Sequence, residues 1–119
     1  MIIVRIKMNA LPEKQKEVMQ TLLSMIDKAG HEEGCLGYEG FCDLEDNYLF
    51  GLIEQWASRE DLNRHIRSEG FSVLLGVRSL LAQPVGIYIH TVSHSEGEEV
   101  VRSLRGKRSL KRPLSIEEE

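Results

Sequence analysis

Apolar and polar residues alternate strictly at the start of the chain. One side of residues 2–9 is wholly apolar and the other side is mixed. Alternation with a period of two predicts a strand that buries one face. The apolar side consists of Ile2, Val4, Ile6 and Met8.

The apolar spacing then changes from that of a strand to that of a helix. Pro12 suits a first helical turn, and Gly30 is a typical residue just after a helix end. We therefore predict a helix over residues 12–29. The apolar stripe of this helix comprises Val18, Leu22, Met25, Ile26 and Ala29.

Two more strands are predicted over residues 34–42 and 48–56. The polar segment 43–47 separates them, so they should form an antiparallel hairpin. Gly37 and Gly40 interrupt the first of these strands. Glycine inside a strand indicates a bulge or a close backbone approach.

A second helical region follows the hairpin. Ser58 and Asp61 have the spacing of a capping box, with Asp in place of the commoner Glu. The helix that they begin should run to about residue 67. Ser68 then caps a further helical segment to about residue 82, and Pro84 ends it. The last strand is predicted over residues 85–93.

The predicted order β-α-β-β-α-β is the split βαβ arrangement of ferredoxin-like α+β folds. It places helices on one face of a four-stranded antiparallel sheet. The opposite face still carries apolar residues and requires a cover. A second copy of the same sheet could supply that cover, so we expect a homodimer.

Residues 1–93 are expected to form one domain and residues 94–119 a charged C-terminal tail. The tail contains acidic and basic blocks with few apolar residues, a composition typical of solvated segments. Val100, Val101 and Leu104 are spaced for one or two helical turns. We expect the tail to be dispensable for folding.

Composition excludes few classes of function. The 119 residues carry a net charge of −4, which argues against a dedicated nucleic-acid-binding protein. No apolar run approaches the ~18 to 20 residues of a membrane span, and the N-terminal residues lack the layout of a signal peptide. A cytoplasmic protein without membrane partners is the resulting expectation. His90 and His94 share a strand face, but no further ligand joins them locally, so no metal site is expected.

The residues that suggest chemistry gather where the third strand ends and the next helix begins. Glu54 and Trp56 share a strand face, and His65 follows in the helix, flanking its apolar stripe. His65 could move a proton or could be a hydrogen-bonded packing residue. Trp56 could line a ligand or fill a core corner, and Glu54 could be buried against a cation or face solvent. Tyr38 could donate a phenolic proton or pair with another side chain across the sheet.

The segments Gly34-Cys35-Leu36-Gly37-Tyr38 and Glu54-Gln55-Trp56-Ala57-Ser58, with His65 and Phe71 after them, resemble the antibiotic biosynthesis monooxygenase family. This family consists of small dimeric α/β-barrel proteins. The resemblance covers residues 1–93 and leaves out the tail. Members of the family include cofactor-free quinone-forming oxygenases, haem-degrading enzymes and isomerase-like proteins of signal metabolism.

The haem-degrading branch fits this sequence poorly. The resemblance places His65 where that branch has a second tryptophan and Leu75 where it has the haem-ligating histidine. Arg5 or Ile6 stands where its first strand carries an asparagine. No nucleotide-binding fingerprint is present either, so no haem or flavin cofactor is expected.

The resemblance implies a cofactor-independent monooxygenase that acts on a small aromatic or quinol-type molecule. In that interpretation His65 and Tyr38 are catalytic residues. The expected substrate-binding residues are Trp56, Glu54, Asn63 and Phe71. The alternative is a small-molecule-binding or stress-response protein with the same fold and no turnover.

Overall fold

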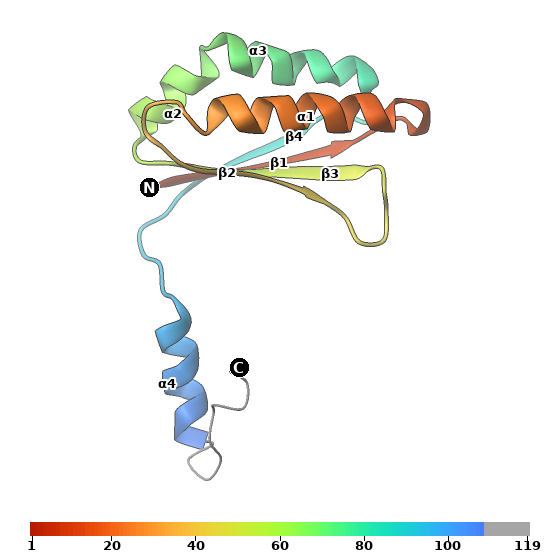
Figure 1. Ribbon diagram of the computed structural model, residues 1–119. Coiled ribbons are helices and arrows are strands. Elements are labelled where there is room, and N and C mark those ends of the chain that lie inside the picture. The colour runs from red at the N-terminus through yellow and green to blue at the C-terminus, as the bar shows by residue number, and fades with distance from the viewer. Residues whose placement is uncertain (109–119) are drawn as a thin grey trace.

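The computed structural model describes residues 1–108 and shows a four-stranded antiparallel sheet covered on one face by helices (Figure 1). Its strands are β1 (Ile2–Asn9), β2 (Cys35–Cys42), β3 (Leu49–Trp56) and β4 (Gly86–Thr91), in the spatial order β2-β3-β1-β4. The covering helices are α1 (Gln15–Ala29), α2 (Arg59–Ile66) and α3 (Glu69–Gly76), with 3₁₀ turns at Pro12–Lys14 and Val77–Leu80. The predicted ferredoxin-like α+β fold is confirmed.

The core lies between the sheet and the helices. The predicted apolar face of β1 is buried there, and the same face of β3 contributes Phe50, Leu52 and Trp56. Helix α1 turns Val18 and Leu22 toward this layer. The alternation in the strands and the stripe on the helix therefore meet in one apolar layer.

The glycines of β2 have the two roles that strand glycines suggest. The pairing of β2 with β3 shifts by one residue between Cys35 and Gly37, which is a β-bulge. At Gly40, an added Cβ would lie 2.7 Å from Cδ1 of Ile26. Gly40 therefore lets α1 pack closely on the sheet.

Both predicted serine caps are present. The Ser58 hydroxyl accepts a hydrogen bond from the Asp61 backbone N–H at 3.1 Å, and Ser68 accepts one from the Phe71 N–H at 3.3 Å. The second helical segment ends earlier than predicted, because Leu81 takes extended backbone angles and pairs with Ala10 in an isolated β-bridge. Near residue 80, pairing with the edge of the sheet therefore decides the backbone conformation, although the apolar residues there have helical spacing.

The face of the sheet opposite the helices is partly apolar. Ile3 and Ile53 are half-buried on it, whereas Phe41 and Tyr88 are 50% and 47% exposed. The guanidinium of Arg5 lies 5.3 Å from the centre of the Tyr88 ring. These five residues make up the open face of the sheet.

The segment predicted as a tail contains a helix, α4 (Glu98–Arg108), which stands apart from the sheet in Figure 1. Its 11 residues exceed the one or two turns that the sequence suggested. The part of the predicted tail over residues 109–119 lies outside the described residues, and the division at residue 93 stays a prediction. Within residues 1–108, the helices are too short or too polar to cross a membrane.

Candidate functional site

His65 lies in the last turn of α2, packed among aromatic rings, with only 2% of its surface exposed. Its imidazole stacks on Trp56 with ring centres 4.6 Å apart and an interplanar angle of 29°. Phe71 and Tyr38 meet it edge-on, at 5.6 Å and 6.0 Å between ring centres. These three rings fix the plane of the imidazole.

A carboxylate faces each nitrogen of this imidazole. Nδ1 of His65 lies 2.8 Å from Oε1 of Glu32, and Nε2 lies 3.7 Å from Oε2 of Glu54. Glu32 belongs to the turn between α1 and β2, and its side chain is 31% exposed. Glu54 is on β3 and is fully buried. The imidazole therefore links a buried carboxylate to one that reaches solvent.

Glu54 is held by its neighbours along and across the sheet. Its Oε1 accepts a hydrogen bond from the Trp56 indole N–H at 3.0 Å. Tyr38 lies directly opposite on β2. Among the described residues, three buried side-chain atoms find no hydrogen-bond partner, and all three belong to this cluster: the Tyr38 hydroxyl, Glu54 Oε2 and His65 Nε2.

The geometry of the two carboxylates bears on which nitrogens of His65 carry hydrogen. An ionised Glu32 can only accept, so Nδ1 of His65 carries a hydrogen. If Nε2 carried none, its lone pair would face the Oε2 atom of Glu54 across 3.7 Å. A proton on Nε2 removes this opposition of two acceptors. We therefore predict that His65 is an imidazolium between two carboxylates.

The direction of the pKa shift agrees with this assignment. Burial lowers the pKa of His65, but the nearby carboxylates of Glu54 and Glu32 both raise it and prevail. Burial, followed by the charge of Glu54, raises the pKa of Tyr38. Tyr38 therefore stays a neutral phenol that can donate a hydrogen bond.

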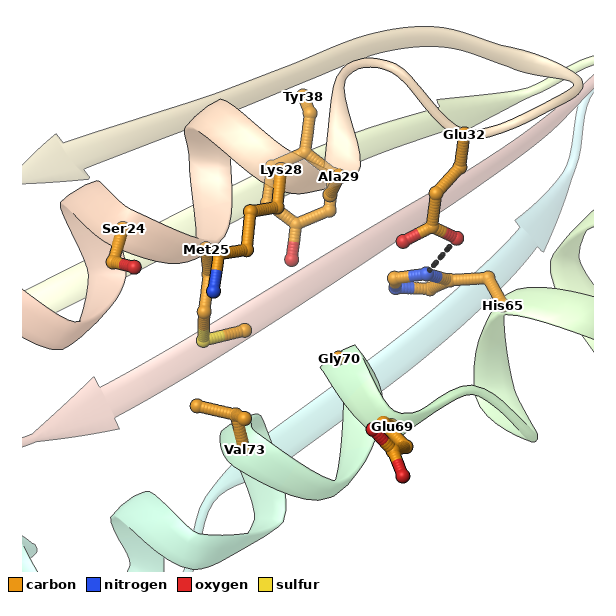
Figure 2. A pocket seen from close by; sticks show the side chains of 10 residues that line it. All are labelled: Ser24, Met25, Lys28, Ala29, Glu32, Tyr38, His65, Glu69, Gly70 and Val73. Carbon is orange, nitrogen blue, oxygen red and sulfur yellow. Dashed lines mark hydrogen bonds and ion pairs between the residues drawn. The ribbon is translucent and has the colours of Figure 1, made fainter.

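A cavity of about 250 Å³ opens beside this cluster, between α1, α3 and β2 (Figure 2). Tyr38, His65 and Glu32 form its polar wall. Its other lining residues are Ser24, Met25, Lys28, Ala29, Glu69, Gly70 and Val73. The cavity thus combines an apolar body with a few polar groups, as small-molecule sites commonly do.

The structure brings together most of the residues that the sequence singled out. His65 and Tyr38 line the cavity, while Trp56 and Glu54 lie behind His65, fully buried. Phe71 supports the imidazole from α3. Their proposed roles in binding a substrate stay predictions.

Asn63 is the expected site residue that neither lines the cavity nor takes part in the cluster around His65. It is on α2, and its Oδ1 accepts a hydrogen bond from Nε of Arg59 at 3.0 Å. Glu32 was missed by sequence reasoning. It stands in the polar run His31-Glu32-Glu33, where only the conformation of the turn distinguishes it from its neighbour.

Other candidate ligands lie apart from this site. His90 accepts a hydrogen bond from Nε of Arg5 at 3.2 Å, and His94 lies 3.1 Å from Glu96. Within residues 1–108, no three His, Cys, Asp or Glu side chains are grouped so that they could hold a metal ion.

Comparison with known proteins identifies the family. The antibiotic biosynthesis monooxygenase family model matches residues 1–74, so the chain belongs to this family. Proteins of curated function gave no sequence match.

Three solved structures illustrate the relationship. A conserved protein from Methanosarcina mazei Go1 is 31% identical, with 75% of this chain and 89% of that chain covered and a TM-score of 0.71. A Pseudomonas aeruginosa protein is 27% identical, with coverages of 78% and 94% and a TM-score of 0.70. A Deinococcus radiodurans protein, named a candidate antibiotic biosynthesis monooxygenase, shares the fold at 19% identity, with coverages of 82% and 97% and a TM-score of 0.76.

The charge on His65 should make stability depend on pH. Because the pKa of His65 is raised on folding, its contribution is complete below its ordinary pKa of about 6.5 and is lost as pH rises through the folded value. We expect the free energy of unfolding in urea to fall between about pH 6 and pH 8. In Glu54→Gln the fall should be smaller, since one carboxylate that raises the pKa is gone.

Above this pH range the free energy of unfolding would also reflect Cys35, because burial raises the pKa of its thiol. A free energy of unfolding that rises with pH across the window would contradict the assignment. An unchanged slope in Glu54→Gln would contradict it equally.

Proposed function

We propose that this member of the antibiotic biosynthesis monooxygenase family is a cofactor-independent monooxygenase. Its substrate would be a small aromatic or quinol-type molecule bound in the cavity beside His65. The observation that carries the proposal is the polar wall of an otherwise apolar cavity, where Tyr38 and a charged His65 meet Glu32. Family membership and fold support the class of reaction, and the site supports the chemistry.

Oxygenation without a cofactor draws its electrons from the substrate. A methylene carbon flanked by aromatic or carbonyl groups loses a proton, and the resulting carbanion reduces O₂. One oxygen atom becomes the new carbonyl oxygen, and the other leaves as water with the two methylene hydrogens. A protein that promotes this reaction has to remove a proton and stabilise an anion.

The site is suited to stabilise such an anion. The positive charge of His65 lies at the cavity wall, where burial strengthens electrostatic interactions. The neutral Tyr38 phenol can donate a hydrogen bond to a developing oxyanion. Trp56 and Phe71 hold the imidazole in place. We propose no direct contact between Asn63 and the substrate.

The size of the cavity suits an aromatic molecule. A cavity of roughly 150 Å³ lined by apolar side chains binds benzene. The cavity here is about 250 Å³, which supports a ligand with two fused rings. Met25, Ala29 and Val73 provide apolar contacts for its faces.

The proposed reaction predicts oxygen uptake that depends on His65. Hydroquinones and anthrone-type ketones, offered as a panel, should include at least one compound whose addition consumes O₂ above the rate in buffer. His65→Ala should lower that rate by roughly 100-fold or more, the usual effect of removing a group that stabilises the developing anion. An oxygen electrode measures both.

Binding without oxygen uptake across the panel would favour the alternative, a small-molecule-binding or stress-response protein with this fold. Uptake that His65→Ala leaves unchanged would place the reaction elsewhere on the chain.

We also propose that two copies associate through the open face to form a homodimer. A second sheet would cover Phe41 and Tyr88, whose exposed rings are otherwise in water. Light scattering at micromolar concentration should give twice the chain mass. Ile53→Glu places a charge at the centre of the open face and should give a monomer.

The matched control is Leu23→Glu, because Leu23 is on α1 and already 61% exposed. This variant should keep the mass of the dimer. A monomer mass for the unmodified chain would refute the dimer.

A further inference from the structure

We propose that Glu32 is the catalytic base of this site. The substrate would accordingly be a weak carbon acid that enters the cavity neutral and ionises there. This inference rests on the proposed function, because it assigns the step in which that reaction removes a proton. It concerns a side chain that the sequence did not mark and that the turn between α1 and β2 brings to the cavity.

The two oxygens of Glu32 have different surroundings. Oε1 accepts the hydrogen bond from Nδ1 of His65 at 2.8 Å. Oε2 faces Gly70, where a Cβ built on the glycine would lie 3.7 Å from it. Because Gly70 has no side chain, the space beside Oε2 stays open to the cavity that both residues line.

Hydrogen bonds hold the backbone on both sides of Glu32, and the bond to His65 holds its carboxylate. The Glu32 N–H donates to the Ala29 carbonyl at 3.1 Å, and the Cys35 N–H donates to the Glu32 carbonyl at 3.1 Å. Figure 2 shows the carboxylate directed from the turn toward the imidazole. A base held in this way is oriented before the substrate arrives.

His65 cannot fill the same role. Both of its nitrogens face carboxylates, and the protonated ring has no free lone pair. Its contribution is a positive charge next to Glu32. That charge favours an anion formed beside it.

The remaining titratable groups near the cavity are less suitable. Glu54 is fully buried behind the imidazole and does not line the cavity. Glu69 lines the cavity, but Figure 2 shows its carboxylate directed away from His65. Lys28 is a cation, and the Tyr38 phenol has a raised pKa, so both are suited to stabilise an anion.

The step is a simple proton transfer. A C–H bond of the substrate breaks, the proton forms an O–H bond with Oε2 of Glu32, and the electron pair stays on the substrate as an enolate. The negative charge forms in the cavity that His65 and Lys28 both line. Since the Glu32 side chain is 31% exposed, its new proton can exchange with water before it returns to carbon.

This exchange gives a test that requires no oxygen. The probe is 2-tetralone, a two-ring ketone whose acidic methylene group lies between the aromatic ring and the carbonyl. Incubated anaerobically in D₂O with the full chain, it should lose its methylene proton signal in NMR faster than in buffer. Glu32→Gln should lower this protein-dependent rate by roughly 100-fold or more.

Two variants show whether a loss reflects chemistry or structure. Glu33→Gln changes the neighbouring glutamate of the same turn, whose side chain is 83% exposed and does not line the cavity, and should leave the rate unchanged. Glu32→Asp keeps a carboxylate on a shorter chain and should restore part of the rate that Glu32→Gln loses. In Glu32→Gln the amide oxygen can still accept the hydrogen bond from His65, so the imidazole keeps its place.

Each outcome decides the proposal. The proposal is overturned if 2-tetralone exchanges as fast with Glu32→Gln as with the unmodified chain. It is also overturned if exchange with the unmodified chain is no faster than in buffer. Exchange that depends on Glu32, without oxygen uptake from any compound, supports the base and refutes the monooxygenase. Oxygen uptake that does not depend on Glu32 supports the monooxygenase and refutes Glu32 as the base.

Discussion

The buried carboxylate of Glu54 sets the requirement that the rest of this site meets. It lies on the face of β3 that packs against the helices, with no exposed surface. An unpaired carboxylate in such a place lowers stability by several kcal/mol. The Trp56 indole supplies one hydrogen bond, and His65 supplies the opposite charge. The last turn of α2 meets this requirement by placing the His65 imidazole against the Trp56 indole.

A cation placed for this reason is also available to a ligand. The imidazole extends from buried Glu54 to partly exposed Glu32, and its edge reaches the cavity wall. The same charge that balances Glu54 can favour an anion formed in the cavity. Structure and proposed chemistry thus both depend on the contact between His65 and Glu54.

Much of the fold could be predicted because its signals are local. The alternation in β1, the apolar stripe of α1 and the two serine caps each specify an element within a few residues. The helical segment after Ser68 was predicted to run too far, because Leu81 joins a bridge to Ala10, a contact far away in sequence.

The site was predictable only in part, for a related reason. His65, Trp56 and Tyr38 follow from strand faces and helical spacing. Glu32 does not, since Glu32 and Glu33 are equivalent in sequence and only the turn conformation directs one of them to the imidazole. Nor does periodicity indicate that Trp56 lies behind the cavity wall instead of forming it.

The charge of His65 is the feature on which both the stability of this site and its proposed chemistry depend. The ¹⁵N chemical shifts of its imidazole at pH 7 report whether one or both nitrogens carry hydrogen, and a His65→Gln sample assigns the signals. We predict that both nitrogens are protonated, as an imidazolium between two carboxylates requires. Shifts of a neutral imidazole, with one protonated and one bare nitrogen, would contradict the account.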